Sequence, residues 1–313
     1  MHQILSAKHD IDFMGQRKLA MRVSATLIVI SLISLLFRGL TFGIDFTGGT
    51  LIEVGYEQPP QLEQVRKVLA DNGFAEAQVQ QFGTPNDLLI RLAPREGVKA
   101  AELSDKVFAA LSQAADGKVE LRRVEFVGPQ VGDELTEDGA LAVLVALMAI
   151  LMYVAVRFEW RFAVGSVAAL VHDVTITLGF FSVTGLEFDL TVLAAVLAVI
   201  GYSLNDTIVV FDRIRENFRK IRKGDSERII NISLNQTLSR TLVTSLTTLL
   251  VLLALFFLGG EIIHNFSLAL ILGIVVGTYS SIYVASTTAL ALGVSKADLM
   301  PVQKEGAQLD DLP

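Results

Sequence analysis

Six long apolar stretches dominate the sequence and limit what the chain can fold into. Each holds about 17 or more residues with few charges, which is enough for a helix to cross roughly 30 Å of hydrocarbon. Composition agrees, since 52% of the 313 residues are hydrophobic and only 19% are charged, a balance that is rare in soluble chains. We therefore predict an α-helical polytopic membrane protein with spans at Leu19–Phe37, Gly139–Val156, Phe162–Thr184, Leu190–Phe211, Leu242–Leu258 and Phe266–Leu292.

The first stretch resembles a secretion signal because Arg17 and Lys18 precede it. It lacks an obvious cleavage site with small residues, and five more apolar stretches follow it. We therefore interpret it as a retained transmembrane helix.

Basic residues in the short loops predict the orientation of the spans. The loop between the second and third spans carries Arg157 and Arg161, whereas the turns at 185–189 and 259–265 carry no Lys or Arg. Because such residues concentrate in cytoplasmic loops, we expect both termini in the cytoplasm and the long loop 39–138 on the other side. The largest basic group lies between the fourth and fifth spans: Arg213, Arg215, Arg219, Lys220, Arg222, Lys223, Arg228 and Arg240.

The long loop has the pattern of a small α/β domain. Pro59 and Pro60 open its first predicted helix and Gly73 closes it, as is usual at helix ends. The order βαββαβ is the split, ferredoxin-like arrangement. The predicted elements are strand Thr50–Tyr56, helix Gln61–Asn72, strands Gln78–Phe82 and Asp87–Leu92, helix Lys99–Ala115 and strand Lys118–Phe126. We divide the chain into 1–38 (N-terminus and first span), 39–138 (α/β domain), 139–292 (spans two to six) and 293–313 (cytoplasmic tail).

Ionisable residues inside the spans are the candidate functional residues, because charge is costly in hydrocarbon. Asp173, beside His172, lies about 18 Å from the cytoplasmic end of the third span. Asp206 lies about 9 Å inside the fourth span, and Arg240 precedes the fifth span by two residues. An Asp206–Arg240 pair is geometrically possible.

A carboxylate shielded from water can load and release a proton, and a nearby arginine can switch it between the two states. One proton crossing 100 mV releases about 2.3 kcal/mol, which is enough to bias a conformational cycle. Structural alternatives remain open. His172 and Asp173 could form a hydrogen-bonded pair that fixes helix packing, Asp206 could be purely structural, and Arg240 could snorkel to the headgroups.

Several function classes find no support in the sequence. The chain has no cysteine, and its four histidines are scattered, so we expect no disulfide and no metal site. It has no phosphate-binding glycine loop and no G-x-S-x-G motif, so we expect neither an enzyme nor a cofactor. Acidic residues outnumber basic ones in the long loop, which argues against nucleic acid as a partner.

Small residues mark places of close packing. Gly273, Gly277 and Ser281 form a stripe in the last span that is typical of helix–helix contact. We expect Gly201 to admit a neighbouring helix, and bending for function is the alternative. Asn205, which directly precedes Asp206, is a further structural or hinge candidate.

Six segments together resemble the SecD/SecF family of protein export, and they cover nearly the whole chain apart from the middle of the α/β domain and the tail. Their order and spacing make the resemblance specific. A SecD chain would carry a much larger first exported loop than this chain has. The segments are GIDFTGG (43–49), VGPQVGDEL (127–135), VRFEWRFAVG (156–165), LVHDVTITLGFFS (170–182), AVIGYSLNDTIVVFDRIREN (198–217) and NQTLSRTLVTSLTTLL (235–250).

The resemblance implies half of a resistance-nodulation-division (RND) transporter in the bacterial inner membrane, with its α/β domain in the periplasm. The implied partners are SecD, the SecYEG translocon, YajC and the unfolded preprotein, and the implied role is proton-driven assistance to late translocation. Asp206 and Arg240 match the essential aspartate and arginine of the family, and Asp173 matches the HD of its third span. A second six-helix half would also cover the flank that a buried ionisable site leaves open to lipid.

Two glycine-rich segments join the α/β domain to its membrane base. Glycine permits tight turns with positive φ, so a hinge is possible there, and a rigid connector is the alternative. The candidate residues are Gly43, Asp45, Gly48, Gly49, Gly128 and Pro129.

Two other functions compete with the export subunit. The chain could be half of an RND-type exporter for lipids or small hydrophobic molecules, although its extramembrane domain of about 100 residues leaves little room for a drug-sized pocket and a docking surface. It could also be a scaffold subunit that moves no protons.

Overall fold

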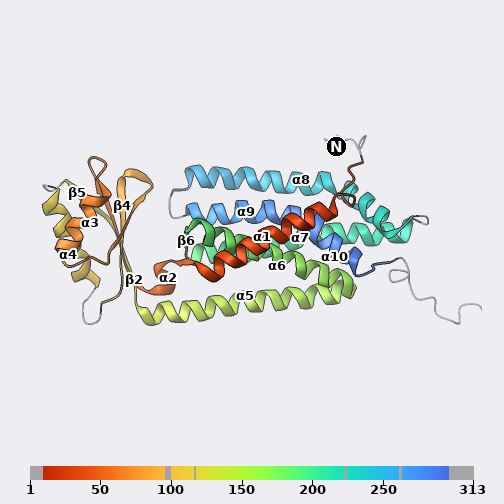
Figure 1. Cartoon of the computed structure of the whole chain (residues 1–313), viewed down its shortest axis with the longest axis horizontal. Coiled ribbons are helices and arrows are strands. Elements are labelled where there is room, and N and C mark those ends of the chain that lie inside the picture. Colours follow the sequence, from red (N-terminus) through yellow and green to blue (C-terminus); the bar gives the residue numbers. More distant parts are fainter. Residues whose placement is uncertain (1–9, 96–99, 116–117, 222–223, 261–262, 296–313) are drawn as a thin grey trace, which may run out of the picture.

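The computed structural model describes residues 10–95, 100–115, 118–221, 224–260 and 263–295. These residues form a bundle of long helices with a small α/β domain at one end (Figure 1). The described N-terminal segment, the end of the fourth long helix and the start of the fifth lie at the other end of the bundle (Figure 1). Six helices are long and apolar enough to span a membrane, which confirms the predicted number of spans.

The helices contain the predicted spans and several continue beyond them. The helix α5 begins at Pro129 rather than at Gly139, and α7 continues past Phe211 because its last turns remain amphipathic. The last span contains a π-helical turn, which the sequence did not predict. The bounds are α1 Arg17–Phe37, α5 Pro129–Arg157, α6 Trp160–Thr184, α7 Leu190–Lys220, α8 Ser226–Leu258, α9 His264–Ser280, the π turn η2 Ser281–Ala285 and α10 Ser286–Ala291.

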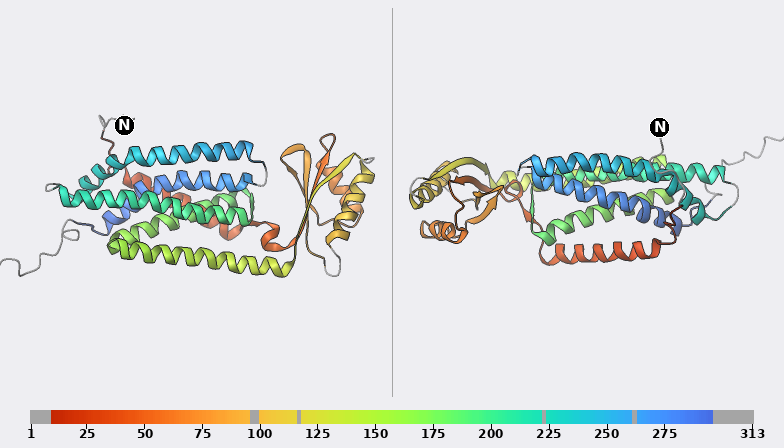
Figure 2. Two further views of the ribbon diagram at one scale, coloured as in Figure 1. Left: turned by 180° about the vertical axis from the view of Figure 1, so that it is seen from behind. Right: turned by 90° about the horizontal axis from the view of Figure 1, so that it is seen from above.

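Three helices form the centre of the bundle. About half of the apolar window is buried in α6, α7 and the last span, against less than a fifth in α1, α5 and α8, and Figure 2 shows the outer helices flanking this centre. The predicted glycine stripe lies at the contact between α9 and α7. A Cβ on Gly273 would lie 2.1 Å from Val199, and one on Gly277 would lie 3.0 Å from Ser203. The glycines therefore let the two backbones approach closely.

The α/β domain has the predicted ferredoxin-like fold. Its sheet has the order β3-β4-β2-β5 with every pair antiparallel, and both helices cover one face (Figure 1). Its core joins strand residues such as Ile52 and Ile90 to Leu69 and Val107 of the helices. The elements are β2 Gly49–Tyr56, α3 Leu62–Asp71, β3 Gln78–Phe82, β4 Thr84–Leu92, α4 Ala100–Ala114 and β5 Val119–Val127.

The GIDFTGG segment forms a compact base under the domain. The strand β1 (Thr41–Phe42) pairs in parallel with β6 (Glu187–Phe188), and the short helix α2 (Ile44–Thr47) follows. The β1–β6 pair was not predicted, because the two strands are far apart in sequence and very short.

The glycines of the two connecting segments differ in conformation. Gly48 and Gly49 have φ of 66° and 133°, and a Cβ on Gly49 would lie 2.6 Å from the carbonyl oxygen of Leu92, so both positions favour glycine. Gly43 and Gly128 both have φ of −67°, so the expected positive φ is wrong for these two. Gly128 instead precedes the first residue of α5, Pro129, which is a favourable place for proline.

Candidate functional site

The centre of the bundle holds a buried histidine–aspartate pair. His172 and Asp173 lie midway along α6 and are 2% and 0% exposed. The Nδ1 atom of His172 lies 2.8 Å from Oδ1 of Asp173. The structure thus confirms that these two neighbours contact each other.

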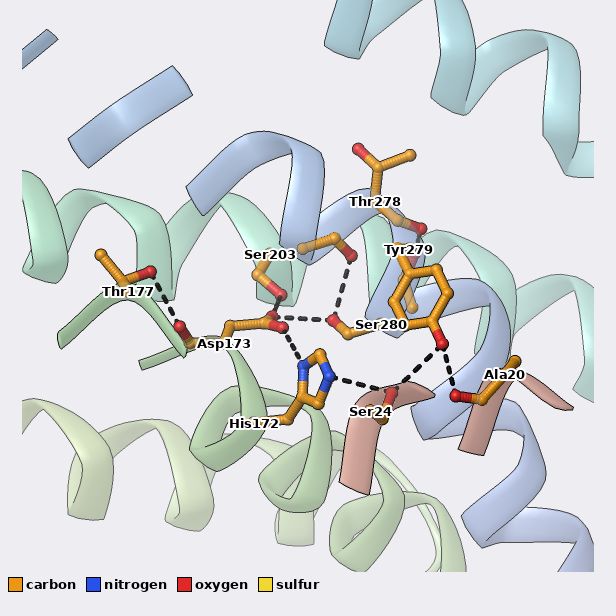
Figure 3. Close-up of polar contacts among 11 residues, drawn as sticks. Ala20, Ser24, His172, Asp173, Thr177, Ser203, Thr278, Tyr279 and Ser280 are labelled. Carbon is orange, nitrogen blue, oxygen red and sulfur yellow. Dashed lines mark hydrogen bonds and ion pairs between the residues drawn. The ribbon is translucent and has the colours of Figure 1, made fainter. Parts of the chain in front are cut away.

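The second oxygen of Asp173 ties α6 to both other central helices (Figure 3). Ser203 of α7 donates to Oδ2 over 2.5 Å, and Ser280 of α9 donates to the same atom over 2.8 Å. Thr177 donates to the main-chain oxygen of Asp173 over 2.8 Å. Both carboxyl oxygens are therefore hydrogen-bonded, as a buried carboxylate requires.

The second nitrogen of His172 reaches the outer helix α1 (Figure 3). Its Nε2 lies 3.1 Å from the hydroxyl of Ser24, and that hydroxyl lies 3.2 Å from the hydroxyl of Tyr279 on α9. Tyr279 in turn donates to the carbonyl oxygen of Ala20 over 2.7 Å. The hydroxyl groups of this network were missed from the sequence, and the only available signal was their polarity within apolar spans.

Asp206 is buried in a different way. It lies three residues after Ser203 on α7 and is 2% exposed. Its Oδ2 atom has no hydrogen-bond partner among the described residues. Leaving an acceptor like this unpaired costs free energy unless something else satisfies it.

The predicted Asp206–Arg240 pair is close but not in direct contact. The guanidinium of Arg240, on α8, acts electrostatically on the Asp206 carboxyl. Within the described part of the chain, however, no hydrogen bond or ion pair joins the two side chains, and Arg240 is exposed on the bundle surface. The arginine is thus near enough to act on the carboxyl electrostatically without a described bond to it.

A stripe of small residues runs along the exposed side of α7 beside Asp206. Gly201 and Asn205 belong to it together with Ala194 and Ala198, and all four are exposed. A Cβ on Gly201 would meet nothing within 4 Å, in contrast to Gly273 in the last span. The helix that Gly201 was expected to admit is not part of the described chain.

The base of the α/β domain is hydrogen-bonded to the start of α7 through contacts of Asp45 and Arg91, which we call the clamp. Asp45 of the GIDFTGG segment accepts a hydrogen bond from the backbone nitrogen of Leu190 over 3.0 Å. Arg91 of β4 donates to the carbonyl oxygen of Phe42 over 2.6 Å and to the hydroxyl of Thr47 over 2.8 Å. The domain is thereby connected to the helix that carries Asp206.

Glu187 lies at this clamp, 3.7 Å from Arg91. Burial raises the pKa of Glu187, and the neighbouring carboxylates of Asp45, Glu125 and Asp189 add to the rise, while Arg91 opposes it. The clamp therefore contains a carboxyl that holds its proton more tightly than usual. Within the described ranges, no three His, Asp or Glu side chains are placed to hold a metal ion.

Two family descriptions match the chain. Residues 107–295 match "Protein export membrane protein SecD/SecF, C-terminal", and residues 33–60 match "SecD/SecF GG Motif". The second match contains the clamped GIDFTGG segment, and the first contains both buried carboxylates.

The chain is also similar to proteins named protein translocase subunit SecF. It is 56% identical to that of Vibrio alginolyticus, with 100% of both chains covered, and 51% identical to that of Pseudomonas aeruginosa, with 97% and 98% covered. Among solved structures, the translocon-associated membrane protein SecDF from Thermus thermophilus matches with a TM-score of 0.83 and 40% identity. That match covers 92% of this chain and 39% of the SecDF chain.

Proposed function

The chain belongs to the SecD/SecF family as a SecDF-type protein translocation subunit, and we propose that it uses the proton motive force to assist late steps of Sec-dependent translocation. In this proposal it lies in the bacterial inner membrane with both termini in the cytoplasm and the α/β domain in the periplasm. It performs no covalent chemistry. It acts with a SecD-type chain, the SecYEG translocon and YajC on an unfolded preprotein.

One observation carries the proposal of proton coupling. Asp206 is only 2% exposed, yet one of its carboxyl oxygens has no hydrogen-bond partner within the described residues. An unpaired ionised oxygen in such a place is costly, and protonation removes the cost. Arg240 favours the ionised form when it approaches and the protonated form when it withdraws.

The exposed small-residue stripe of α7 supports a partner beside Asp206. Exposed Gly201 and Asn205 let another helix approach closely, and the exposed Arg240 is unfavourable against lipid. The SecDF chain of Thermus thermophilus is much longer than the part matched here. We propose that a SecD-type half covers this stripe and completes the surroundings of Asp206.

The clamp at the start of α7 can transmit a movement of this helix, caused by protonation of Asp206, to the α/β domain. A shift of α7 would act on Asp45 through its hydrogen bond to Leu190, and on the domain through Arg91. In this proposal the α/β domain moves when the proton load changes, and the movement draws preprotein away from the membrane. Whether the glycine pair Gly48–Gly49 hinges in that movement remains a prediction.

The proposal is tested by translocation into inverted membrane vesicles with and without a proton gradient. We expect Asp206→Asn to assemble normally and to lose the gradient-dependent part of translocation, because the amide cannot carry a proton. Asp212→Asn is the matched control. It lies on the same helix, but its side chain is 45% exposed and pairs with Arg157 over 3.2 Å, so it should leave the gradient effect intact.

Two results would overturn the proposal. Wild-type gradient dependence in Asp206→Asn would remove proton coupling through this carboxyl and leave a scaffold subunit. Co-purification of the chain with a periplasmic adaptor, in place of a SecD-type chain and the translocon, would favour an RND-type exporter.

A further inference from the structure

The hydroxyl groups of Ser24 and Tyr279 can each donate only one hydrogen, and this limit constrains the protonation of His172. Tyr279 has one hydroxyl hydrogen and two contacts, to the carbonyl oxygen of Ala20 at 2.7 Å and to Ser24 at 3.2 Å. A carbonyl oxygen only accepts, so the hydrogen of Tyr279 goes to Ala20. The contact between the two hydroxyls then uses the single hydrogen of Ser24.

This leaves His172 as the donor in its contact with Ser24. The Nε2 atom lies 3.1 Å from the Ser24 oxygen, and Ser24 has no hydrogen left to donate to it. The network shown in Figure 3 is therefore complete only when Nε2 carries a hydrogen.

A hydrogen on Nε2 fixes the proton count of the pair. With Nδ1 of His172 at 2.8 Å from Asp173, one more proton lies between these two atoms. The pair is then either an imidazolium beside a carboxylate or a neutral imidazole beside a carboxylic acid. Both forms hold the same total, one proton more than a neutral histidine beside an ionised aspartate, and their net charge is zero.

We propose that Ser24 and Tyr279 are positioning residues that report the proton load of the His172–Asp173 pair to α1. When the pair gives up its extra proton to solvent, its net charge becomes −1 and Nε2 becomes an acceptor. The hydrogen of Ser24 then turns to Nε2, and the hydrogen bond from Ser24 to Tyr279 is lost. This hydrogen bond between α1 and α9 therefore exists only in the loaded state, while the bond from Tyr279 to the carbonyl oxygen of Ala20 joins the two helices in both states.

The helix that loses this hydrogen bond leads directly to the α/β domain. The helix α1 ends at Phe37, and β1 and the clamped GIDFTGG segment follow it. Release of one proton in the centre of the bundle thus removes the longer of the two hydrogen bonds that Tyr279 makes to α1 beside the pair. This is a second route to the domain, separate from the clamp at the start of α7.

The groups that contact the pair are mostly uncharged. Ser24 comes from α1, Ser203 from α7, and Ser280 and Tyr279 from α9. The tyrosine ring lies 6.1 Å from the imidazole ring, with an angle of 25° between the planes. Asp206 lies three residues beyond Ser203 on α7.

The inference rests on the proposed proton-driven function, but its test does not require translocation. The chain is produced with its SecD-type partner in lipid bilayers and labelled with nitrogen-15 histidine, and the His172 signals are assigned by their absence in His172→Gln. We expect a directly bonded hydrogen on Nε2 of the wild-type protein at neutral pH. Tyr279→Phe should abolish it, because Ser24 is then free to donate to Nε2.

Two further variants make the test decisive. In a Ser24→Ala background, Tyr279→Phe should leave the Nε2 signal unchanged, because the proposed route between the two side chains runs through the Ser24 hydroxyl. Tyr283→Phe is the matched control, because its ring lies 5.2 Å from that of Tyr279 on the same span and it makes no hydrogen bond to Ser24 or His172 among the described residues. It should keep the wild-type signal.

The results separate this inference from the proposed function. A bare Nε2 in wild type, or an unchanged Nε2–H in Tyr279→Phe, overturns the role of the two hydroxyls even if Asp206→Asn stops gradient-driven translocation. Conversely, loss of Nε2–H in Tyr279→Phe supports that role even if Asp206→Asn translocates normally, in which case only coupling through Asp206 fails.

Discussion

The two buried aspartates of the bundle differ in how far the chain itself satisfies them. Asp173 is 0% exposed and Asp206 is 2% exposed. Both oxygens of Asp173 are hydrogen-bonded, to His172, Ser203 and Ser280. By contrast, Oδ2 of Asp206 has no partner in the described residues. One carboxyl is satisfied within the described chain, and the other has an oxygen that the described chain leaves unpaired.

This difference follows from position. Asp173 lies in the helix that packs against α1, α7 and α9, so hydroxyl groups surround it on several sides. Asp206 lies further along α7, beside the exposed Gly201 and Asn205 and near the exposed Arg240. A fully bonded carboxylate stabilises the fold, whereas one with an unpaired oxygen can change its protonation without breaking a hydrogen bond at that oxygen.

The largest expected effect contrasts the two carboxylates directly. Asp173→Ala leaves His172 and Ser203 without this acceptor and leaves Ser280 only the carbonyl oxygen of Gly277 at 3.1 Å, and we expect a loss of about 3–5 kcal/mol in the free energy of unfolding. Asp206→Ala removes no hydrogen bond to Oδ2, so we expect a loss below about 1 kcal/mol. Both are measured by denaturant unfolding in detergent. Similar losses in the two variants would show that the contrast is wrong.

A second pair of variants contrasts the two glycine positions. A Cβ on Gly273 would lie 2.1 Å from Val199, so we expect Gly273→Ala to cost about 1–3 kcal/mol by overpacking. Gly201→Ala meets nothing within 4 Å and should leave the stability of the isolated chain unchanged, but should weaken association with a SecD-type chain. Normal association in Gly201→Ala, measured by co-purification at decreasing concentration, would argue against this face as the interface.

The smallest effect concerns the pH dependence of the clamp. Because the pKa of Glu187 is raised in the folded state, the folded protein holds this proton more tightly than the unfolded chain does. The resulting stability is fully present below the ordinary value of 4.5 and is lost as pH rises through the raised pKa.

Glu187→Gln should lack this pH dependence. The wild type should therefore lose stability relative to the variant as pH rises above 4.5, measured as unfolding free energy. Glu63→Gln is the control, since that side chain is 89% exposed. A constant difference between the wild type and Glu187→Gln across this range would contradict the raised pKa.

The sequence predicts the spans and the α/β domain because both depend on local patterns, namely apolar length and the order of amphipathic elements. It also identifies Asp173 and Asp206, since charge inside a span is conspicuous. It does not identify Ser24, Ser203 or Ser280, because a lone serine in a span is ordinary until packing places it against a carboxylate.

Long-range strand pairing could not be predicted from the sequence either. The two residues of β1 pair with the two residues of β6 only because the packed helices place them side by side. The direct Asp206–Arg240 contact that spacing allowed is absent from the described chain, in which Arg240 is exposed.

Proton transport by the reconstituted complex tests the central claim most directly. The chain and its SecD-type partner are placed in vesicles that contain a pH-sensitive dye, and proton entry is followed after a gradient is imposed. We expect gradient-driven proton entry with the wild type and with Asp212→Asn, and only background entry with Asp206→Asn. Equal proton entry with Asp206→Asn and wild type would contradict the claim that this carboxyl carries the proton.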